Sequence, residues 1–445
     1  MRFLGKRFSS FLLEIMKLRI DNGRVLDPAT GLDSVGSIAL AAGRIIGIGR
    51  MPEGFEPARV IDAAGCLVLP GLVDLAARLR EPGHEHERML ESEMAAAVAG
   101  GVTSLVCPPD TDPVLDEPGL VEMLKFRAEK LHQARLFPLG ALTHGLKGEV
   151  LTEMVELTES GCVGFGQAEV PLASTQVLQR ALQYAATFGY TAWLRPQEMS
   201  LGKGVAASGA IATRLGLPGV PVAAETIALQ TIFDLVRSSG ARVHLCRLSS
   251  GAGVELLRRA KAEGLSVTAD VSINSLMLTD EEIGYFDSRA RLAPPLRQAS
   301  DRAALSKALA DGTIDALVSD HMPVDDDAKT LPFGEAEPGA TGLELLLPVA
   351  LHWAASENVP LRRALAVATS AAAGVLGHAL GTLQASVGRL VEGGVGDLCI
   401  VEPDERFEVV GQALVSQGKY TPFEGHALPG RVRCTVVAGQ VAFER

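Results

Sequence analysis

The stretch CLVLPGLVDLAARLREPG, residues 66–83, begins with a nearly continuous apolar run that ends at one acid, Asp74. A run of this kind is typical of a β-strand that is buried on both faces of a parallel sheet. The segment Arg-Glu-Pro-Gly (80–83) follows a few residues later. Because functional side chains of barrel folds lie at the carboxyl ends of strands, we expect a site here.

The same pattern recurs along the chain, with Ala/Leu-rich amphipathic segments between most of the apolar runs. The further strand candidates are GVTSLVCP (101–108), RLFPLGAL (135–142), CVGFG (162–166), YTAWLR (190–195), RVHLCRL (242–248), LSVTADV (265–271) and IDALVSD (314–320). Eight such units between residues 70 and 380 predict an α/β fold of the (β/α)8 TIM-barrel type. A doubly wound sheet is the alternative. The barrel is favoured because no Gly-rich phosphate loop follows the first strand.

Both ends of the chain are rich in short strands and turns instead. We therefore expect residues 16–68 and 385–445 to form one small β-sandwich-like domain, and residues 69–384 to form the barrel. Residues 1–15 are basic with a short apolar patch and no small-residue cleavage site, which disfavours a signal peptide. They are interpreted as a disordered extension or as an annotation artefact that precedes a true start at Met16.

Composition narrows the functional class. The 445 residues are 47% hydrophobic and 21% charged, as in globular proteins, and the formal net charge is -12. This charge disfavours nucleic acid and anionic membranes as general partners. The six cysteines are scattered without a C-x-x-C pair, which predicts a reduced, cytoplasmic protein.

Several motifs together resemble the dihydroorotases, a family of the metal-dependent amidohydrolase superfamily. They are PGLVD, LREPG, GGVTS, the ADV and LTDEE block, PPLR, SDH-x-P, GLE and the closing TPFEGHALPGRV. The resemblance runs from about residue 17 to the end. It implies a site for one or two zinc ions at the carboxyl ends of the strands.

The metal-ligand positions implied by this resemblance are almost all changed. In the family's first-strand motif D-x-H-x-H-x-R, Asp74 and Arg80 are retained, but Ala76 and Arg78 replace both histidines. The position of the acid or carboxylated lysine that bridges the metals matches Gln167. The remaining ligand positions are matched by Arg195, by Arg247 and by Asp320, of which only the last is a family ligand.

These replacements cannot bind zinc, which takes neutral imidazole, thiolate or carboxylate donors. Alanine has no donor atom, and arginine stays protonated without a lone pair. Three convergent guanidinium groups would also repel a cation, by about 3 kcal/mol per pair of unit charges at ~6 Å and a dielectric constant of about 20. Without zinc, nothing lowers the pKa of an attacking water.

The substrate positions implied by the resemblance are changed as well. The carboxylate-binding arginine of the family corresponds to Arg80. Asp110 replaces an asparagine, Ala293 replaces a second one, and Asn274 and Ser275 replace a pair of histidines. This pattern resembles noncatalytic dihydroorotase-like proteins. The resemblance implies no cofactor and a partner, aspartate carbamoyltransferase, which such proteins help to assemble in pyrimidine biosynthesis.

We therefore expect a homo- or hetero-oligomer with no nucleic-acid or membrane partner, and the residues favour a protein without catalytic activity. One alternative is an active zinc-dependent dihydroorotase or related cyclic amidohydrolase with an atypical site. Another is a sensor whose Arg78, Arg195 and Arg247 bind an anion. The alternative to the sensor is an internal ion-pair network. In it, the arginines pair with Asp320, Glu198 or Asp110, and these side chains fill the cavity that the family uses for metal and substrate.

Other polar groups allow two interpretations each. Asp320 and His321 are either a surviving acid–base pair, or Asp320 pairs with a new arginine. His84-Glu85-His86 is either a displaced metal site or the solvated start of a helix, which we favour. Residues 325–339 are expected to be a solvated acidic loop. No role is expected for the remaining histidines of helices and loops, which are His132, His144, His352, His378 and His426.

Overall fold

The computed structural model describes residues 17–171 and 174–445, and a ring of parallel strands lies at its centre. The ring consists of β6 (Leu72–Asp74), β7 (Val102–Cys107), β8 (Arg135–Pro138), β9 (Gly140–Ala141), β10 (Phe165–Gly166), β11 (Thr191–Leu194), β14 (Arg242–Leu245), β15 (Val267–Ser272) and β16 (Ala316–Val318). They form one sheet in the order β6-β7-β8 and another in the order β16-β15-β14-β11-β10-β9. Since β8 and β9 are one strand interrupted at Leu139, the ring has eight strands.

The ring closes beyond the ends of its first and last strands. A parallel bridge joins Ala77 to His321. The amide of Arg78 donates to the carbonyl of His321 at 2.9 Å, and the amide of His321 donates to the carbonyl of Ala76 at 3.1 Å. The predicted (β/α)8 barrel is therefore confirmed. Its strands are buried almost throughout, which explains why they read as continuous apolar runs.

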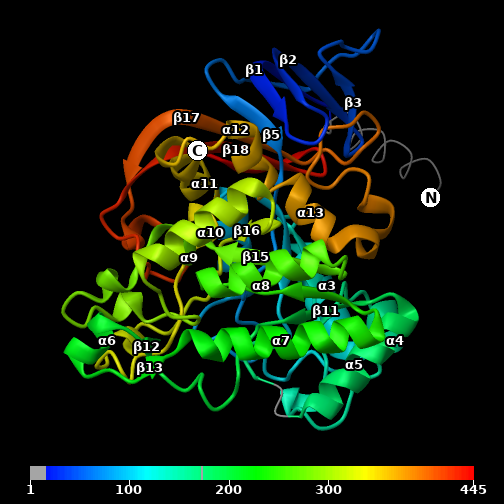
Figure 1. Ribbon diagram of the computed structural model, residues 1–445. Coiled ribbons are helices and arrows are strands. Elements are labelled where there is room, and N and C mark those ends of the chain that lie inside the picture. Colours follow the sequence, from blue (N-terminus) through cyan, green and yellow to red (C-terminus); the bar gives the residue numbers. More distant parts are fainter. Residues whose placement is uncertain (1–16, 172–173) are drawn as a thin grey trace.

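Helices surround the ring (Figure 1). The longer ones are α2 (Leu90–Ala99), α3 (Pro118–Lys130), α5 (Thr175–Phe188), α7 (Val222–Ser239), α8 (Gly251–Ala262), α10 (Ala299–Asp311) and α11 (Leu346–Ser356). Shorter ones are α4 (Met154–Glu159), α6 (Ala210–Leu215), α9 (Ile273–Met277), α12 (Leu361–Ala366) and α13 (Ser370–Leu376). A small parallel pair, β12 (Ala206–Ala207) and β13 (Gly219–Val220), lies beside α6. Short 3-10 helices are η1 (His144–Leu146), η2 (Asp280–Ile283), η3 (Ser288–Ala290), η4 (Asp327–Lys329), η5 (Leu343–Leu345), η6 (Gly377–Leu383) and η7 (Gly411–Ala413).

Helix α5 shows how local sequence sets these elements. Ser174 caps its first turn by accepting a hydrogen bond from the amide of Val177 at 3.3 Å. Gly189 ends it with a φ of 74°, a conformation that glycine adopts without a steric penalty. Between the two caps, Leu178, Leu182 and their neighbours on the same face are buried against the barrel.

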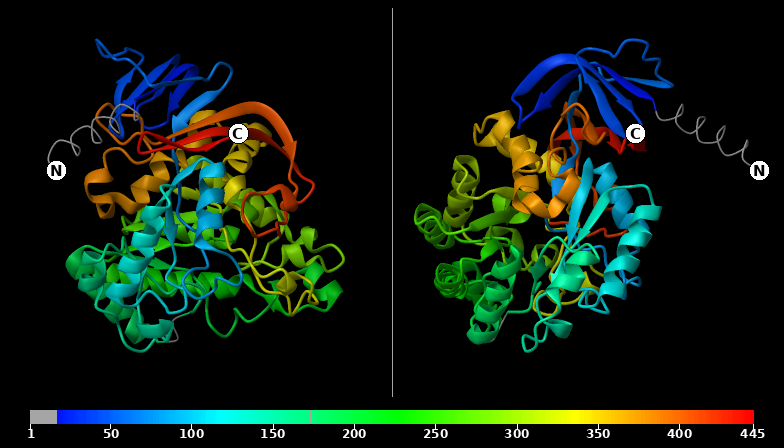
Figure 2. Two further views of the ribbon diagram at one scale, coloured as in Figure 1. Left: turned by 180° about the vertical axis from the view of Figure 1, so that it is seen from behind. Right: turned by 90° about the vertical axis from the view of Figure 1, so that its right-hand side faces the viewer.

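Segments from both ends of the chain form one mostly antiparallel sheet above the barrel (Figures 1 and 2). Its strands are β1 (Leu18–Asp27), β2 (Leu32–Ala41), β3 (Arg44–Ile48), β4 (Arg59–Asp62), β5 (Leu67–Pro70), β17 (Leu398–Glu408), β18 (Ala427–Val437) and β19 (Gln440–Glu444). The central strand β5 pairs with β1 on one side and with β17 on the other. Side chains of β1, such as Leu18, pack in one cluster with Ile400 and Val436, so the sheet curls around its own core.

The β domain and the barrel share a tightly packed junction. Gly101, which precedes β7, has a φ of 83°, and a Cβ there would come within 2.5 Å of the Cys399 sulfur of β17. The hydroxyl of Thr435 on β18 also donates to the carbonyl of Val98 on α2, at 2.6 Å. The two domains therefore hold each other in a defined orientation at this point.

One apolar segment, Leu361–Leu383, has the length and mean hydropathy of a membrane span. In the structure it is divided into α12, α13 and η6, and 56% of its most apolar window is buried inside the protein. Much of this segment therefore packs inside the protein. The expected extension at residues 1–15 lies outside the described residues.

Candidate functional site at the carboxyl ends of the barrel strands

Three arginines from different strands converge on one carboxylate, that of Glu169. Arg78 follows β6, Arg195 follows β11 and Arg247 follows β14, and each forms an ion pair with Glu169, which follows β10. Arg78 Nη2 lies 2.9 Å from Glu169 Oε1, and Arg195 Nη1 lies 2.5 Å from Oε2. A carboxylate therefore occupies the point on which the altered metal-ligand positions converge.

Two further acids complete the network. Arg78 Nε donates to Asp110 Oδ2 at 2.8 Å, and Arg247 Nη1 donates to Asp320 Oδ1 at 3.0 Å. Arg78 and Arg247 are each only 4% exposed. Three guanidinium groups thus face three carboxylates, which relieves the repulsion among the cations and satisfies buried charges that would otherwise be costly.

The network fixes the ionisation of its acids. Burial alone would raise the pKa of Glu169, but Arg247, Arg195 and Arg78 together hold that pKa far below its usual range. Burial raises the pKa of Asp320, and its pairing with Arg247 only partly offsets this effect. Glu169 is therefore a fixed anion at neutral pH and below.

Little space remains beside these ion pairs. The cavity bounded by Ala76, Arg78, Trp193, Arg195 and Arg247 has a volume of about 30 Å³. Ligand sites for small molecules usually occupy roughly 300–1,000 Å³. The cavity is therefore large enough for a water molecule or two, and much too small for a substrate-sized molecule.

Backbone strain accompanies the ion pairs. Arg247 and Asp320 have positive φ angles of 55° and 51°, in the left-handed region that most side chains avoid. The amide of Arg247 is held by the carboxylate of Asp270, Oδ1, at 2.6 Å. These turns aim both side chains across the strand ends toward each other.

Glu169 was not among the residues expected from the sequence. The position that we matched to the bridging ligand, Gln167, turns its amide away to Leu146 and Thr143, donating to the Leu146 carbonyl at 2.8 Å. Glu198, which we considered for the network, instead accepts from the amides of Ser200 and Leu201. The sequence offered one signal, because Glu169 is an acid without an assigned role two residues beyond Gln167. Only the structure places it opposite three arginines.

Asp320 and His321 face different surroundings. Asp320 pairs with Arg247, whereas His321 Nε2 lies 2.8 Å from Glu93 Oε2, and its Nδ1 accepts from the amide of Gly342 at 3.2 Å. The interpretation of the two as a joint acid–base pair is therefore wrong, and His321 belongs to a buried contact with α2.

Arg80, the position of the family's substrate-binding arginine, is also engaged. Its Nε donates to the carbonyl of Pro323 at 2.7 Å and forms an ion pair with Glu87 Oε2 at 2.9 Å. Among the other substrate positions, the carbonyl of Ala293 accepts from Arg247 Nη1 at 3.1 Å. Asn274 and Ser275 are buried in α9. The residues matched to substrate positions are therefore engaged in internal contacts or buried.

The retained Asp74 is buried, and its carboxylate accepts several hydrogen bonds. It accepts from the amide and the hydroxyl of Ser319 and from the amide of Ala76. Burial raises the pKa of Asp74 to about 6, although the hydrogen bonds from Ser319 oppose this shift. Its ionisation therefore falls within an experimentally accessible range of pH.

This shift predicts a pH-dependent difference between the native chain and Asp74→Asn, which imitates the protonated side chain. The folded-state pKa is raised, so the stabilising contribution is complete below the unfolded pKa of about 3.9 and is lost as pH rises through 6. Between pH 4 and 7, we expect the native chain to lose about 2 kcal/mol in free energy of unfolding relative to the variant, measured by urea titration. Asp234→Asn, at an exposed position, should show no such trend, and a flat difference for Asp74→Asn would contradict the shift.

The altered family positions do not fit zinc. Ala76 offers no donor, and Arg78, Arg195 and Arg247 offer only cations, so Asp320 alone of the six could bind a metal. A second group, His244, Cys246 and Asp270, has its donor atoms within 4.8 Å of one another. The donor atoms of this group are not free to bind a metal. Both ring nitrogens of His244 are hydrogen-bonded, to Thr268 and to Asp270. Burial raises the pKa of the Cys246 thiol, which disfavours the thiolate that a metal would need.

A third group that could hold a metal lies outside the family positions. It comprises His84, His86 and Glu87, with donor atoms also within 4.8 Å of one another. These residues lie in turns, and α2 begins only at Leu90, so the expected placement at the start of a helix is wrong. Candidate metal donors among the described residues are therefore not restricted to the positions that the family uses.

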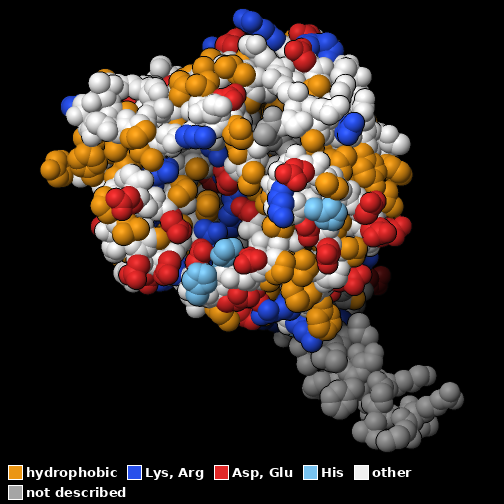
Figure 3. All heavy atoms as spheres, turned by 90° about the horizontal axis from the view of Figure 1, so that it is seen from below, with side chains coloured by type: hydrophobic (Ala, Val, Ile, Leu, Met, Phe, Trp, Pro, Cys, Tyr) orange, Lys and Arg blue, Asp and Glu red, His pale blue; other side chains and the backbone are white. Residues whose placement is uncertain are grey.

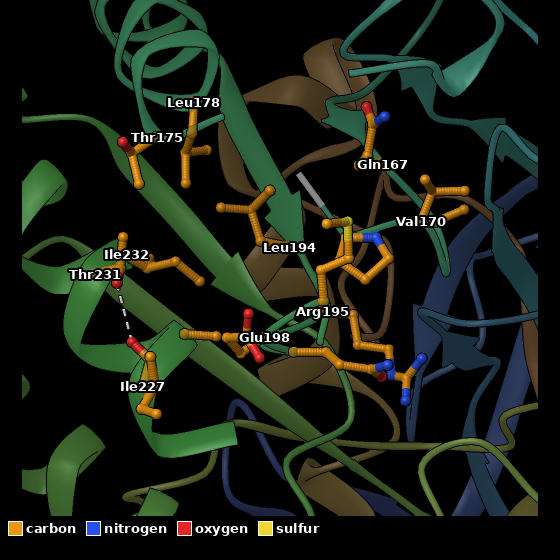
Figure 4. A pocket seen from close by; sticks show the side chains of 15 residues that line it. Gln167, Val170, Thr175, Leu178, Leu194, Arg195, Glu198, Ile227, Thr231 and Ile232 are labelled. Carbon is orange, nitrogen blue, oxygen red and sulfur yellow. Dashed lines mark hydrogen bonds between the residues drawn. The ribbon is translucent and has the colours of Figure 1, made fainter. Parts of the chain in front are cut away.

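A separate side cavity lies between α5, β11 and α7, with a volume of about 190 Å³. Figure 4 looks into it: Leu178, Leu194 and Ile232 form an apolar side, and Arg195 and Glu198 lie beside it. Arg195 is thus shared between the ion-pair network and this cavity. The lower face of the molecule also has a central hollow in which acidic and basic side chains gather, with histidines at its edge (Figure 3).

The segment 325–339 is more ordered than we expected. Ala328 and Phe333 are buried, and Lys329 is only 4% exposed. Lys329 donates to the carbonyls of Arg291 and Glu337, and burial lowers the pKa of its ammonium to about 7. The acidic composition of the segment suggested full solvent exposure and gave no sign of these buried side chains. The interpretation as a solvated loop is therefore wrong in part.

Comparisons with known proteins place this architecture in a family. A model of dihydro-orotase-like proteins matches residues 65–252, and a model of the amidohydrolase family matches residues 209–442. The chain is 43% identical to a dihydroorotase-like protein of Pseudomonas aeruginosa, over 96% of this chain and all of the relative. This chain belongs to the dihydroorotase-like proteins of the amidohydrolase family. The resemblance noted in the sequence is confirmed at this level.

Other members of the family bear a different name. A dihydroorotase of Geobacter sp. (strain M21) is 37% identical over 96% of this chain and its own full length. Among solved structures, the L-hydantoinase (dihydropyrimidinase) of Arthrobacter aurescens has a TM-score of 0.84 and 25% identity, covering 96% of each chain. The dihydroorotase-like chain therefore shares its barrel and β domain with cyclic-amide hydrolases.

Proposed function

We propose that this dihydroorotase-like chain is a noncatalytic subunit that associates with aspartate carbamoyltransferase and supports its assembly in pyrimidine biosynthesis. The observation that carries the noncatalytic part is the closed network of Glu169 with Arg78, Arg195 and Arg247. An internal carboxylate stands in the place of a bridging ligand, and cations stand in the place of imidazoles. The partner follows from the resemblance to noncatalytic family members, which is an associational argument.

The intact scaffold supports a role in binding. Damage to buried strands commonly costs several kcal/mol, yet the barrel strands here remain apolar and closely packed. The altered residues are confined to the strand ends and are charge-compensated there. This combination suits a chain that is selected to stay folded but not to turn over a substrate.

The catalytic part of the proposal is tested by incubating purified chain with zinc and carbamoyl aspartate at mildly acidic pH and measuring ring closure. We expect no turnover above the uncatalysed rate. We also expect the amount of bound zinc to be the same in the native chain and in Asp320→Asn. A dihydroorotase from the same family, run in parallel, establishes that the assay works. Turnover that is abolished by Asp320→Asn would establish the alternative, an active dihydroorotase with an atypical site.

The partner is tested by co-expression with the cognate aspartate carbamoyltransferase, followed by size-exclusion chromatography. We expect both chains to elute together and the transferase alone to be smaller or less active. Separate elution, with a transferase that is complete and active by itself, would reject the assembly role without bearing on the ion-pair network.

The sensor alternative rests on the same arginines and has less support. Each of the three already faces an internal carboxylate, and the space between them is about 30 Å³. Isothermal titration with phosphate and with carbamoyl aspartate should therefore give no binding heat in the native chain. Saturable binding with a 1:1 stoichiometry would favour the sensor.

A further inference from the structure

The turn between β6 and α2 carries two histidines and a glutamate that no other part of the site uses. Donor atoms of His84, His86 and Glu87 all lie within 4.8 Å of one another. His84 is 32% exposed and Glu87 is 11% exposed, so the group is accessible from solvent but partly enclosed. None of the three coincides with a metal-ligand position of the family.

The spacing of two of the donors suits a small tetrahedral cation. His84 Nδ1 lies 3.2 Å from Glu87 Oε1. Two ligands bound at about 2.0–2.1 Å in a tetrahedron are separated by about 3.3 Å. The histidine and the carboxylate therefore stand at nearly the separation that a zinc ion would impose. The donor of the exposed His86 completes the group, since all three donor atoms lie within 4.8 Å of one another.

Hydrogen bonds hold this turn in shape. The amide of His84 donates to the carbonyl of Arg80 at 2.9 Å, and the amide of Glu87 donates to the carbonyl of His84 at 2.9 Å. The side chain of Glu85 accepts from the amide of Gly83 at 3.0 Å. The ligands are thus presented by a folded turn, which lowers the entropy that metal binding would remove.

Arg80 lies beside the carboxylate without donating a hydrogen bond to it. Arg80 Nε is 2.9 Å from Glu87 Oε2, but its N–H donates to the carbonyl of Pro323, so Glu87 Oε2 accepts no hydrogen bond and the contact is electrostatic. Glu87 Oε1 faces His84 Nδ1 at 3.2 Å. Arg80, the family's substrate-binding position, would then serve as the outer support of a different site.

We propose that His84, His86 and Glu87 form a site for a divalent transition-metal ion, with zinc as the ion that the donors suit best and water at the remaining position. Two imidazoles and one carboxylate on a single turn are a typical zinc donor set. The contrast with His244, Cys246 and Asp270 supports the choice, because the donors of that group are engaged with one another or protonated. The inference is independent of the noncatalytic role.

The test is equilibrium dialysis of the full-length chain, first stripped with a chelator, against zinc, with metal content measured by elemental analysis. We expect one equivalent to bind saturably with a micromolar or lower dissociation constant. His84→Ala and His86→Ala should each weaken binding at least tenfold, and Glu87→Ala should do the same. Cobalt in place of zinc should give the visible absorption of a four- or five-coordinate ion.

Two control variants separate a built site from adventitious binding. His378→Ala removes an exposed histidine elsewhere, and Glu91→Gln removes an exposed negative charge from the first turn of the following helix without removing a ligand. Both should bind zinc as the native chain does. Circular dichroism spectra that match the native chain would establish that the variants are folded. Binding that does not saturate, or that survives in the double variant of His84 and His86, would overturn the proposal.

Discussion

Glu169→Gln is expected to lower the free energy of unfolding by about 3 kcal/mol or more. The substitution keeps the shape of the side chain but removes the one charge, among residues 17–171 and 174–445, that contacts Arg78, Arg195 and Arg247 together. Two of these guanidinium groups would keep a single carboxylate each, and Arg195 would lose its ion-pair partner. Urea titration at pH 7 measures the loss.

The pH dependence provides a second check. The pKa of Glu169 is lowered in the folded protein, so its stabilising contribution is present above the unfolded pKa of about 4.3 and is lost only as pH falls through the folded value. The difference between the native chain and Glu169→Gln should therefore be constant from pH 6 to 8. Glu149→Gln, at an exposed position, should change stability by less than about 0.5 kcal/mol.

A shorter side chain at this position should create an anion site. Glu169→Ala removes the carboxylate and also opens space among the three arginines, so inorganic phosphate should raise the melting temperature of Glu169→Ala more than that of the native chain, at equal ionic strength. A variant that is as stable as the native chain and indifferent to phosphate would show that the three arginines do not depend on Glu169.

Arg247→Met is expected to cost a comparable 3–5 kcal/mol, because it leaves a buried carboxylate without its cation. Arg247 contacts Glu169, Asp320 and the carbonyl of Ala293, and Asp320 is only 6% exposed. Burial already raises the pKa of Asp320 while Arg247 is present. Removing the arginine should raise it further.

The sign of the resulting pH effect follows from that shift. A group whose folded pKa is raised loses its stabilising contribution as pH rises through that value, so Arg247→Met should be more destabilised at pH 7 than at pH 5. Thermal unfolding at both values measures this. Arg237→Met, which breaks exposed ion pairs with Asp234 and Glu263, is the matched control and should cost less than about 1 kcal/mol. Equal losses in the two variants would argue against a buried network.

The two substitutions should not be additive. Residues within one ion-pair network commonly couple by 0.5–3 kcal/mol, and the double variant removes both partners of a contact at once. We expect Glu169→Gln combined with Arg247→Met to be less destabilised than the sum of the two single losses. Additivity would show that each residue acts alone.

The sequence by itself determined the barrel and showed which residue types stand at the positions matched to the family's metal ligands. Apolar runs such as 101–108 and 314–320 could be placed because a strand buried on both faces has no polar alternation to obscure it. The replacement of imidazoles at Ala76 and Arg78 could be read directly, because donor chemistry is a property of the residue and needs no coordinates.

Only the tertiary structure decided which groups compensate these changes. Glu169 and Arg247 lie 78 residues apart in the chain, and nothing in local sequence ranks that acid above Glu198 or Gln167 as the partner. The same holds for Glu87 with Arg80 and for Glu93 with His321. Ion pairing depends on distance and direction in space, which the closure of the barrel sets by bringing the ends of separate strands to one point.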